Sequence, residues 1–530
     1  MILLLACLLS LAALSGVLVY QRSRKLERFE RLVASFMPIL ATLLAVEVFV
    51  KILTEPLETW NDVRLARTFA LFNGTKLYPG ANVNTPIVGT LHTPMSHILF
   101  WPATLAKAPV CAIYIGSVTA FVLVFAPILW LHLQPCLAGA RSVLLSSYAL
   151  LTCGYVVLQG SPEGGMRYCA FHIHTDAAAI CFATIAAGLI YQAKSSPRWG
   201  RLWSSSLFAI LSLCSKQTMA PFLLALCAFL LLAYGMRAAL RYLSCLLASG
   251  VVVSSVLAAL FWPPKDVFFN IATLASHRPW VPGQLSLVSQ ELNQEVLPVA
   301  FSLLLYVLYW YFYDHGPSEG WRTLFSTQQW LVFPLIGVLL FPVCVKARLT
   351  VGGDSNHVGA CCFFLMLGVT LGISQFMNDE TSSGAKAAAS KLFATALIVV
   401  SLPGVVTVIS HSIHIQRART SSVSLAYAYA LKYPGRAYFP WNPLAEFFAQ
   451  HRFYHFDSAL QDREFAGYGI SRAQYTSGIP SDFALVAFPR DEPISRALQD
   501  YLSGWQQVND PELPGWIVFQ RPPAAPRNPR

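Results

Sequence analysis

The chain has 530 residues, of which 55% are hydrophobic and only 12% are charged, and its formal net charge is +11. A mean hydropathy of +0.53 over this length excludes an ordinary soluble domain and a disordered chain, and it predicts a polytopic membrane protein. The basic residues flank apolar runs instead of forming one patch, so the charge indicates membrane topology and no nucleic-acid partner.

The chain contains 12 cysteines, nearly all inside apolar runs and none in the polar C-terminal segment. Cysteines in such runs are typical of small buried hydrophobic residues. We find no CxxC pair, no HExxH motif and no Cys/His cluster in the sequence. The sequence therefore predicts no structural or catalytic zinc site.

The first apolar run covers residues 1–20 and is followed by basic residues from Arg22 to Arg31. A cleaved signal peptide carries its positive charge before the apolar run, so we predict a membrane span instead. The positive-inside rule places the basic segment in the cytoplasm and the N-terminus outside. The next span, at about residues 34–53, then brings the following segment to the outer face.

Residues 59–108 are too polar to cross a bilayer yet lie between apolar runs, which predicts a long structured loop at the outer surface. Trp60 and Val63 begin a pattern of helical spacing, and the amphipathic helix it predicts would turn Asp62 toward the protein body. A short apolar segment at residues 97–106 has about half the length of a span. We expect that segment to lie along the membrane interface.

Further apolar runs follow the loop and bring the total to about twelve crossings. They cover approximately residues 110–133, 143–159, 175–192, 202–216, 219–234, 243–262, 296–312, 330–345, 358–373 and 392–410. Their alternation places most basic residues in cytoplasmic loops, which agrees with the orientation taken from the first loop. The predicted fold is a mainly α polytopic membrane protein with an outer loop of juxtamembrane helices and a small C-terminal α/β domain.

An even number of spans puts the C-terminal segment outside, on the side of the Asp62 loop. Short apolar segments between turn residues predict strands at 437–440, 453–456, 483–488 and 516–519, and helices at 444–450 and 494–502. We expect a compact α/β domain whose last ten residues are disordered. The predicted division is a transmembrane domain over residues 1–410, with its outer loop at 54–109, and an extracytoplasmic domain over 411–530.

Two acidic residues are placed at the outer face by this topology. Asp176 directly precedes an apolar run, so it would lie at a helix mouth on the same side as Asp62. The two carboxylates would then converge in a functional site, since an acid at a membrane boundary is costly. Thr175 and Asp176 are equally typical of a helix cap, and both interpretations stay open.

Cationic residues occur in two outer turns. Lys216 lies in a tight turn between apolar segments, and Lys346 and Arg348 lie in a glycine-containing loop that continues to Asn356 and His357. Such groups are typical contacts for a phosphate or a sugar. The ordinary alternatives are a lysine that extends to the interface and a solvated loop.

The order of these features resembles the GT-C superfamily of polyprenyl-phosphate-sugar-dependent glycosyltransferases, which includes protein O-mannosyltransferases and the lipid A aminoarabinose transferase. The shared pattern is a span followed by a long outer loop with an acidic residue and two juxtamembrane helices. The segments that carry it are Asn61-Asp62-Val-Arg-Leu-Ala-Arg, Tyr78-Pro79, His92-Thr-Pro-Met-Ser-His, His174-Thr-Asp176, Leu213-Cys-Ser-Lys216-Gln217, Phe261-Trp-Pro-Pro and Gly352-Gly-Asp-Ser-Asn356-His357. Two departures are His92-Thr-Pro-Met, where relatives often have a basic residue before Pro-Pro-Leu-Tyr, and the additional first span.

The resemblance implies a role for each matching residue. Asp62 would be the general base on the acceptor, and Asp176 would be the acid of the second outer loop. The donor phosphate would be bound by Lys216, Lys346 and Arg348, and the sugar or acceptor by His92, His174, Gln217, Asn356 and His357. Some relatives use a divalent metal, but the sequence has no acidic cluster beyond Asp62 and Asp176 to bind one, so we expect no metal or other cofactor.

The expected activity is an inverting transfer of a hexose or pentose from a polyprenyl-phosphate donor to a glycan, lipid or protein acceptor. It would take place on the non-cytoplasmic face of a lipid bilayer, which the resemblance suggests is a bacterial inner membrane of the cell envelope. A transporter or a flippase for lipid-linked glycans is the main alternative, and such proteins tend to carry charges near the membrane midplane and paired halves. A surface-glycan polymerase or ligase is a third, for which a large late outer loop is expected.

Overall fold

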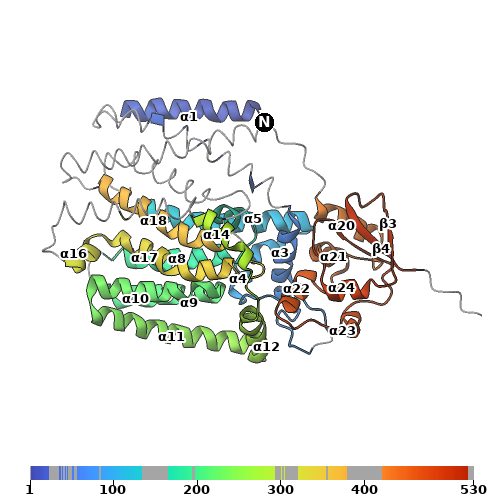
Figure 1. Ribbon diagram of the computed structural model, residues 1–530. Helices are drawn as coiled ribbons and strands as arrows, with labels where there is room; N and C mark the ends of the chain where they lie inside the picture. The colour runs from blue at the N-terminus through green and yellow to red at the C-terminus, as the bar shows by residue number, and fades with distance from the viewer. Residues whose placement is uncertain are drawn as a thin grey trace, which may run out of the picture.

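The structure is a computed structural model that describes residues 2–22, 57–82, 85–133, 165–193, 197–292, 320–353, 356–378 and 421–522, with a few isolated positions between them. It is mainly helical and ends in a small sheet with helices (Figure 1). Four described helices are long and apolar enough to cross a membrane, namely Pro109–Leu133, Gln217–Tyr234, Met236–Leu260 and Gln329–Arg348. A multi-pass membrane protein is thereby supported.

The described helices of the N-terminal part overlap the predicted runs, although the one predicted at 243–262 begins seven residues earlier, at Met236. They are α1 (Ile2–Arg22), α3 (Thr59–Phe72), α4 (Met95–Ile98), η1 (Trp101–Leu105), α5 (Pro109–Leu133), α7 (Gly165–Phe171), α8 (Thr175–Tyr191), α9 (Trp199–Ser215), η3 (Gln217–Met219), α10 (Ala220–Tyr234) and α11 (Met236–Leu260). Predicted spans at 143–159 and 392–410, and most of those at 34–53 and 296–312, lie outside the described residues. The total of about twelve crossings therefore stays a prediction.

The second part of the bundle begins with short helices at one end. These are α12 (Pro264–Phe268), the π-helix η4 (Phe269–Thr273), α13 (Leu274–Ser276), η5 (Pro282–Gln284) and α14 (Leu285–Glu291). They are followed by α16 (Gly320–Thr327), η8 (Gln329–Leu331), α17 (Val332–Arg348) and α18 (Asn356–Asn378). α17 and α18 pack against each other through small residues, because a Cβ on Gly368 would lie 2.4 Å from Cδ of Pro334.

Hydrogen bonds from serine side chains fix the direction in which α8 and α9 pack. Ser205 Oγ donates to the Ala186 carbonyl at 2.9 Å, and Ser212 Oγ donates to the Ala179 carbonyl at 2.8 Å. The partner number falls along one helix as it rises along the other, so the two helices are antiparallel. The start of α8 therefore lies beside the end of α9, which is where Asp176 meets the turn after α9.

The C-terminal unit is a mixed four-stranded sheet with helices, which confirms the predicted α/β character of this segment. Its elements are α20 (Ser422–Lys432), β1 (Ala437–Tyr438), α21 (Pro443–Gln450), α22 (Asp457–Phe465), α23 (Arg472–Ser477), β2 (Leu485–Pro489), α24 (Arg496–Tyr501), β3 (Gln506–Val508) and β4 (Trp516–Gln520). The strand order is β1-β2-β4-β3, with β1 parallel to β2 and the other pairs antiparallel. Leu485 of β2 lies opposite Gln520 of β4 and Pro489 lies opposite Trp516.

One predicted strand, at residues 453–456, is wrong. This segment does not pair as a strand. Phe456 N donates to the Ile87 carbonyl at 2.9 Å and Ile87 N donates to Nδ1 of His455 at 2.9 Å, while the His455 carbonyl accepts from the Tyr438 hydroxyl of β1 at 2.7 Å. Its hydrogen bonds therefore go to the outer loop and to a side chain of the sheet. The third strand, β3, was not predicted, because its Gln-Gln-Val sequence has little apolar character.

The outer loop and the C-terminal unit pack together at one end of the helical bundle (Figure 1). Arg463 of α22 donates to the carbonyls of Pro79 at 2.9 Å and Gly80 at 2.7 Å. Phe69 of α3 packs edge-on against Phe447 and Phe448, with ring centroids 5.5 and 5.3 Å apart. The predicted amphipathic helix is therefore present as α3, and its buried face covers both the bundle and the C-terminal unit.

Candidate active site

Charged and hydrogen-bonding side chains meet at the start of α8. The N-cap residue is His174, whose Nδ1 accepts a hydrogen bond from Asp176 N at 3.3 Å. Asp176 is 2% exposed and lies in the first turn of the helix, two residues after this N-cap. Its carboxylate forms an ion pair with Lys216 and lies 2.9 Å from Nδ1 of His174. The functional role of Asp176 stays a prediction, and the structure adds that its carboxylate is buried and paired.

Lys216 reaches Asp176 because α9 ends at Ser215 and its next residue takes an extended conformation. The lysine is 4% exposed, so both charges of the pair are removed from water. Breaking such a pair is costly because it leaves an uncompensated charge in a buried site. Gln217, the next residue, donates to the carbonyls of Leu91 at 2.6 Å and Ile271 at 3.1 Å, and thereby ties the turn to the outer loop.

His92 and His174 lie near this ion pair as neutral imidazoles, and His97 lies near His92. Burial and the charge of Lys216 hold the pKa of His92 well below its usual value, and burial lowers the pKa of His97 to about 3. Burial also lowers the pKa of His174 to about 4, although the Asp176 carboxylate opposes that shift. Nδ1 of His92 is buried and has no hydrogen-bond partner among the described residues. The charge of His357 also acts on Asp176, which places the start of α18 in the same region.

Arg67 is a cation that sequence reasoning did not single out. It lies on α3, is 8% exposed, and donates through Nη2 to Ser458 Oγ at 3.3 Å. Its buried Nε has no hydrogen-bond partner among the described residues, and its charge lowers the pKa of both His92 and His97. Arg67 therefore adds a buried positive charge near the histidines.

Asp62 contacts a different part of the molecule. Its side chain is fully buried, Oδ1 accepts from Leu444 N at 2.8 Å, and Oδ2 accepts from Nδ2 of Asn442 at 3.3 Å. Both donors belong to the start of α21. Burial raises the pKa of Asp62 to about 7, against the effect of these two hydrogen bonds. The neighbouring Asn61 accepts from Ile173 N at 2.8 Å, so it is Asn61 that contacts the segment before α8.

At residues 346–357, where the sequence predicts further phosphate contacts, the arginine is bound by other parts of the protein. Arg348 is 7% exposed and pairs with Glu291, with Nη2 lying 2.9 Å from Oε1. It also donates to the Gly353 carbonyl at 2.9 Å, so its fork is occupied by protein acceptors. Lys346 is exposed on α17, and the side chain of Asn356 lies outside the described residues. The structure thus brings Asp176, Lys216, His174 and His92 together and gives Arg348 a separate ion pair.

A surface pocket of about 370 Å³ lies between the outer loop and α21. Two of its aromatic rings, those of Phe447 and Phe453, stack with centroids 4.6 Å apart. The lining residues are Asn73, Thr75, Pro86, Phe447, His451, Arg452 and Phe453. Sequence reasoning did not find this pocket, because its walls come from segments far apart in the chain.

One group of described side chains has the ligand types of a metal site, although the sequence led us to expect none. Cys169, His174 and Asp176 each offer one ligand atom, and these atoms lie within 4.8 Å of one another. The three residues are close in sequence, so their spacing could have identified them. No protein-family model matches the chain, and comparison with curated proteins also finds no match.

Proposed function

We propose that the chain is an integral membrane glycosyltransferase that moves a sugar from a polyprenyl-phosphate donor to an acceptor hydroxyl on the non-cytoplasmic face. The observation that carries this proposal is the buried Asp176–Lys216 ion pair, which lies at one end of the apolar helices together with Arg67 and His92. A carboxylate and cations are the groups that such a transfer requires.

The reaction divides between these two kinds of group. The acceptor oxygen attacks the anomeric carbon while the bond from that carbon to the phosphate oxygen breaks, and the polyprenyl phosphate leaves with the bonding electrons. A cation stabilises the negative charge on the departing phosphate. A carboxylate takes the proton from the acceptor hydroxyl. Attack opposite the leaving group inverts the anomeric configuration.

Lys216 and Asp176 could perform these roles in sequence. In the structure each neutralises the other, so neither is fully available. A donor phosphate that binds Lys216 would compete with Asp176 for the ammonium group, and Asp176 would then be more basic toward the acceptor. Arg67 and the imidazole of His92 supply further hydrogen-bonding groups nearby. We therefore infer that Asp176 and Lys216 act as a coupled pair.

The general-base role expected for Asp62 stays a prediction. Its raised pKa of about 7 suits a base that works near neutral pH. Its carboxylate oxygens, however, accept hydrogen bonds from α21 of the C-terminal unit. We propose that Asp62 orients the C-terminal unit on the outer loop and that Asp176 is the stronger candidate for the base.

The test uses purified full-length protein in lipid nanodiscs with a panel of polyprenyl-phosphate sugars and candidate acceptors. Mass spectrometry would follow sugar transfer and release of polyprenyl phosphate. We expect Lys216→Gln to lower turnover by roughly 100-fold or more, as for removal of one transition-state donor. The matched control is Lys107→Gln, which removes an exposed cation of the outer loop to which we assign no role and should leave turnover close to wild type.

Equal turnover in wild type and Lys216→Gln would contradict the proposed role of the ion pair. The alternative of a transporter or flippase predicts movement of a solute or lipid-linked glycan across vesicles with no donor turnover. That result would replace the transferase proposal.

A further inference from the structure

Three side chains of different ligand type converge where α7 meets α8. Sγ of Cys169 lies 3.5 Å from Oδ2 of Asp176 and 4.0 Å from Nδ1 of His174, and the last two atoms are 2.9 Å apart. All three residues are at most slightly exposed, with only His174 not fully buried. The atoms that face one another are a sulfur, an imidazole nitrogen and a carboxylate oxygen, each of which ligates metal ions in proteins.

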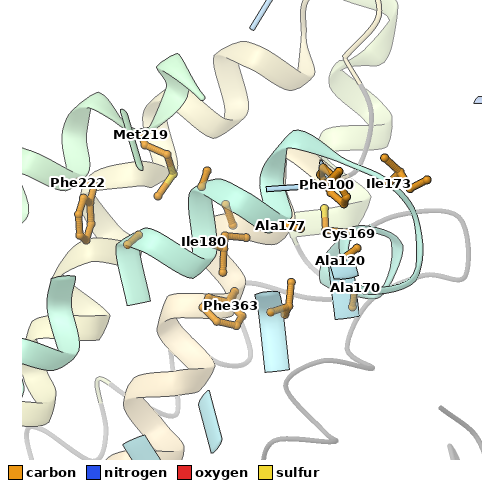
Figure 2. Close-up of a cluster of buried hydrophobic side chains, with 14 of the residues drawn as sticks. Phe100, Ala120, Cys169, Ala170, Ile173, Ala177, Ile180, Met219, Phe222 and Phe363 are labelled. Atoms are coloured by element: carbon orange, nitrogen blue, oxygen red, sulfur yellow. The ribbon is translucent and has the colours of Figure 1, made fainter. Parts of the chain in front are cut away.

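The backbone holds these groups in place from two sides. α7 ends at Phe171 and α8 begins at Thr175, so the short connection folds Cys169 back toward Asp176. Ser117 of α5 donates to the Phe171 carbonyl, and Ile173 N donates to the side chain of Asn61 at 2.8 Å. Cys169 belongs to the same buried cluster as Phe100 and Ile173 (Figure 2). A preorganised position of this kind favours a specific ligand geometry.

We propose that Cys169, His174 and Asp176 bind one divalent cation of the zinc class. Zinc bonds of about 2.0–2.3 Å in a tetrahedron place neighbouring ligand atoms roughly 3.3–3.6 Å apart. The three separations above differ from that range by about 0.5 Å or less, so small side-chain shifts would complete the site. A thiolate with an imidazole selects Zn²⁺ or Co²⁺ over Mg²⁺ and Ca²⁺, which prefer all-oxygen sites.

The neighbouring charges are compatible with a bound cation. Lys216 pairs with Oδ1 of Asp176, whereas the converging oxygen is Oδ2, so one carboxylate can serve both partners. The metal would replace the long 3.3 Å contact from Asp176 N to Nδ1 of His174. Binding converts the Cys169 thiol into a metal-bound thiolate and releases its proton to solvent. Three protein ligands leave a fourth position for water or substrate. Metal binding here does not depend on the transfer reaction.

Cobalt provides the sharpest test, because a thiolate bound to Co²⁺ gives a charge-transfer absorption band. Full-length protein in detergent would be stripped with a chelator and titrated with Co²⁺, and metal content would be measured by mass spectrometry. We expect one Co²⁺ per chain, a near-ultraviolet band, and its loss when Zn²⁺ is added. Mg²⁺ should not compete.

Cysteine variants distinguish metal binding at this site from metal binding at other thiols. Cys169→Ser should lose the band and bind Co²⁺ at least 10-fold more weakly, a loss typical of altered metal ligands. Cys181→Ser, which changes another buried cysteine on α8, should retain both. Asp176→Asn gives a second variant that keeps the shape of the side chain and should weaken binding. Absence of the band in wild type, or an equal band in Cys169→Ser, would overturn the site whatever the outcome of the glycosyl-transfer assay.

Discussion

Asp176 and Lys216 depend on each other because both charges are buried. Replacement of Lys216 by Met leaves the Asp176 carboxylate without its cation, and we expect the free energy of unfolding to fall by about 3–5 kcal/mol. The double variant with Asp176→Asn should lose clearly less than the sum of the two single variants. Denaturant unfolding in detergent would measure this cycle. Additive losses would show that the two side chains are not coupled.

Asp62 can be tested without disturbing the contact with α21. Oδ1 of Asn442 is buried and has no hydrogen-bond partner among the described residues, so a flipped Asn442 amide could accept from an asparagine at position 62. We therefore expect Asp62→Asn to fold like wild type and Asp62→Ala to be less stable by about 2–3 kcal/mol, because it leaves buried donors unpaired. Thermal unfolding measures both.

The same pair of variants decides the role of Asp62 in the reaction. If Asp62→Asn folds normally and keeps wild-type turnover, Asp62 is not the base. If it folds normally and loses turnover, the expectation from sequence is correct and our assignment to Asp176 is not.

Sequence patterns identified the residues that stand at the ends of apolar runs. Asp176, Lys216 and His174 have this signature, because a polar group beside a long apolar run is conspicuous. Arg67 and Cys169 do not have it: an arginine on an amphipathic helix and a cysteine beside apolar residues are ordinary in those positions. The fold, and not the spacing, brings Arg67 close to the histidines.

At the level of elements, α17 and α18 offer a direct test of close helix packing. A Cβ on Gly368 would lie 2.4 Å from Cδ of Pro334, so Gly368→Ala should force the helices apart and destabilise the protein by about 1–3 kcal/mol. Gly200 on α9 has nothing within 4 Å of the corresponding position. Gly200→Ala should therefore have no destabilising effect, since alanine favours helix. Unfolding in detergent compares the two, and equal stability would contradict the tight contact.

The predicted elements agree with the structure where hydrophobic periodicity and length identified them. α5 at Pro109–Leu133 begins one residue before its predicted run, and α21 at Pro443–Gln450 matches its predicted helix to within one residue. Residues 453–456 have a strand-like composition, but their backbone bonds to Ile87 of the outer loop. Composition alone cannot tell whether an extended segment pairs with a strand or bonds to a loop, because either partner satisfies its backbone groups.

At the level of the whole molecule, His455 of the C-terminal unit hydrogen-bonds to the outer loop, and this contact forms in only one protonation state of its ring. Nδ1 accepts from Ile87 N and Nε2 donates to the Tyr475 carbonyl at 2.9 Å, so the ring is neutral. Burial lowers its pKa to about 4, the bond to Tyr475 opposes that shift, and the charge of Arg463 adds to it. This contact therefore requires an unprotonated ring.

The pH dependence follows from that pKa. Below about pH 6.5 the unfolded chain protonates this histidine, while the folded chain does so only near pH 4, so stability falls as pH falls through this window. The loss is on the order of 3 kcal/mol. Hydrogen exchange of β2 would report it. Asp457, whose pKa burial raises to about 6, acts in the opposite direction over part of the window.

His455→Gln isolates the contribution of the histidine, because an amide can accept from Ile87 and donate to Tyr475 without titrating. We expect the difference in stability between wild type and this variant to change across pH 4 to 6.5. A difference that is constant with pH would contradict the neutral-ring contact.

The contact between Ile87 and His455 also sets an order of events during biosynthesis. The two residues are 368 positions apart, so at about 5–20 residues per second the outer loop waits between roughly 20 and 75 s for its partner to be translated. During that interval the carbonyls of Pro79 and Gly80 also lack the Arg463 side chain that binds them in the finished protein. A premature stop codon ahead of residue 455 would therefore impair the beginning of the chain, and the earliest loop to be translated would be among the last parts to mature.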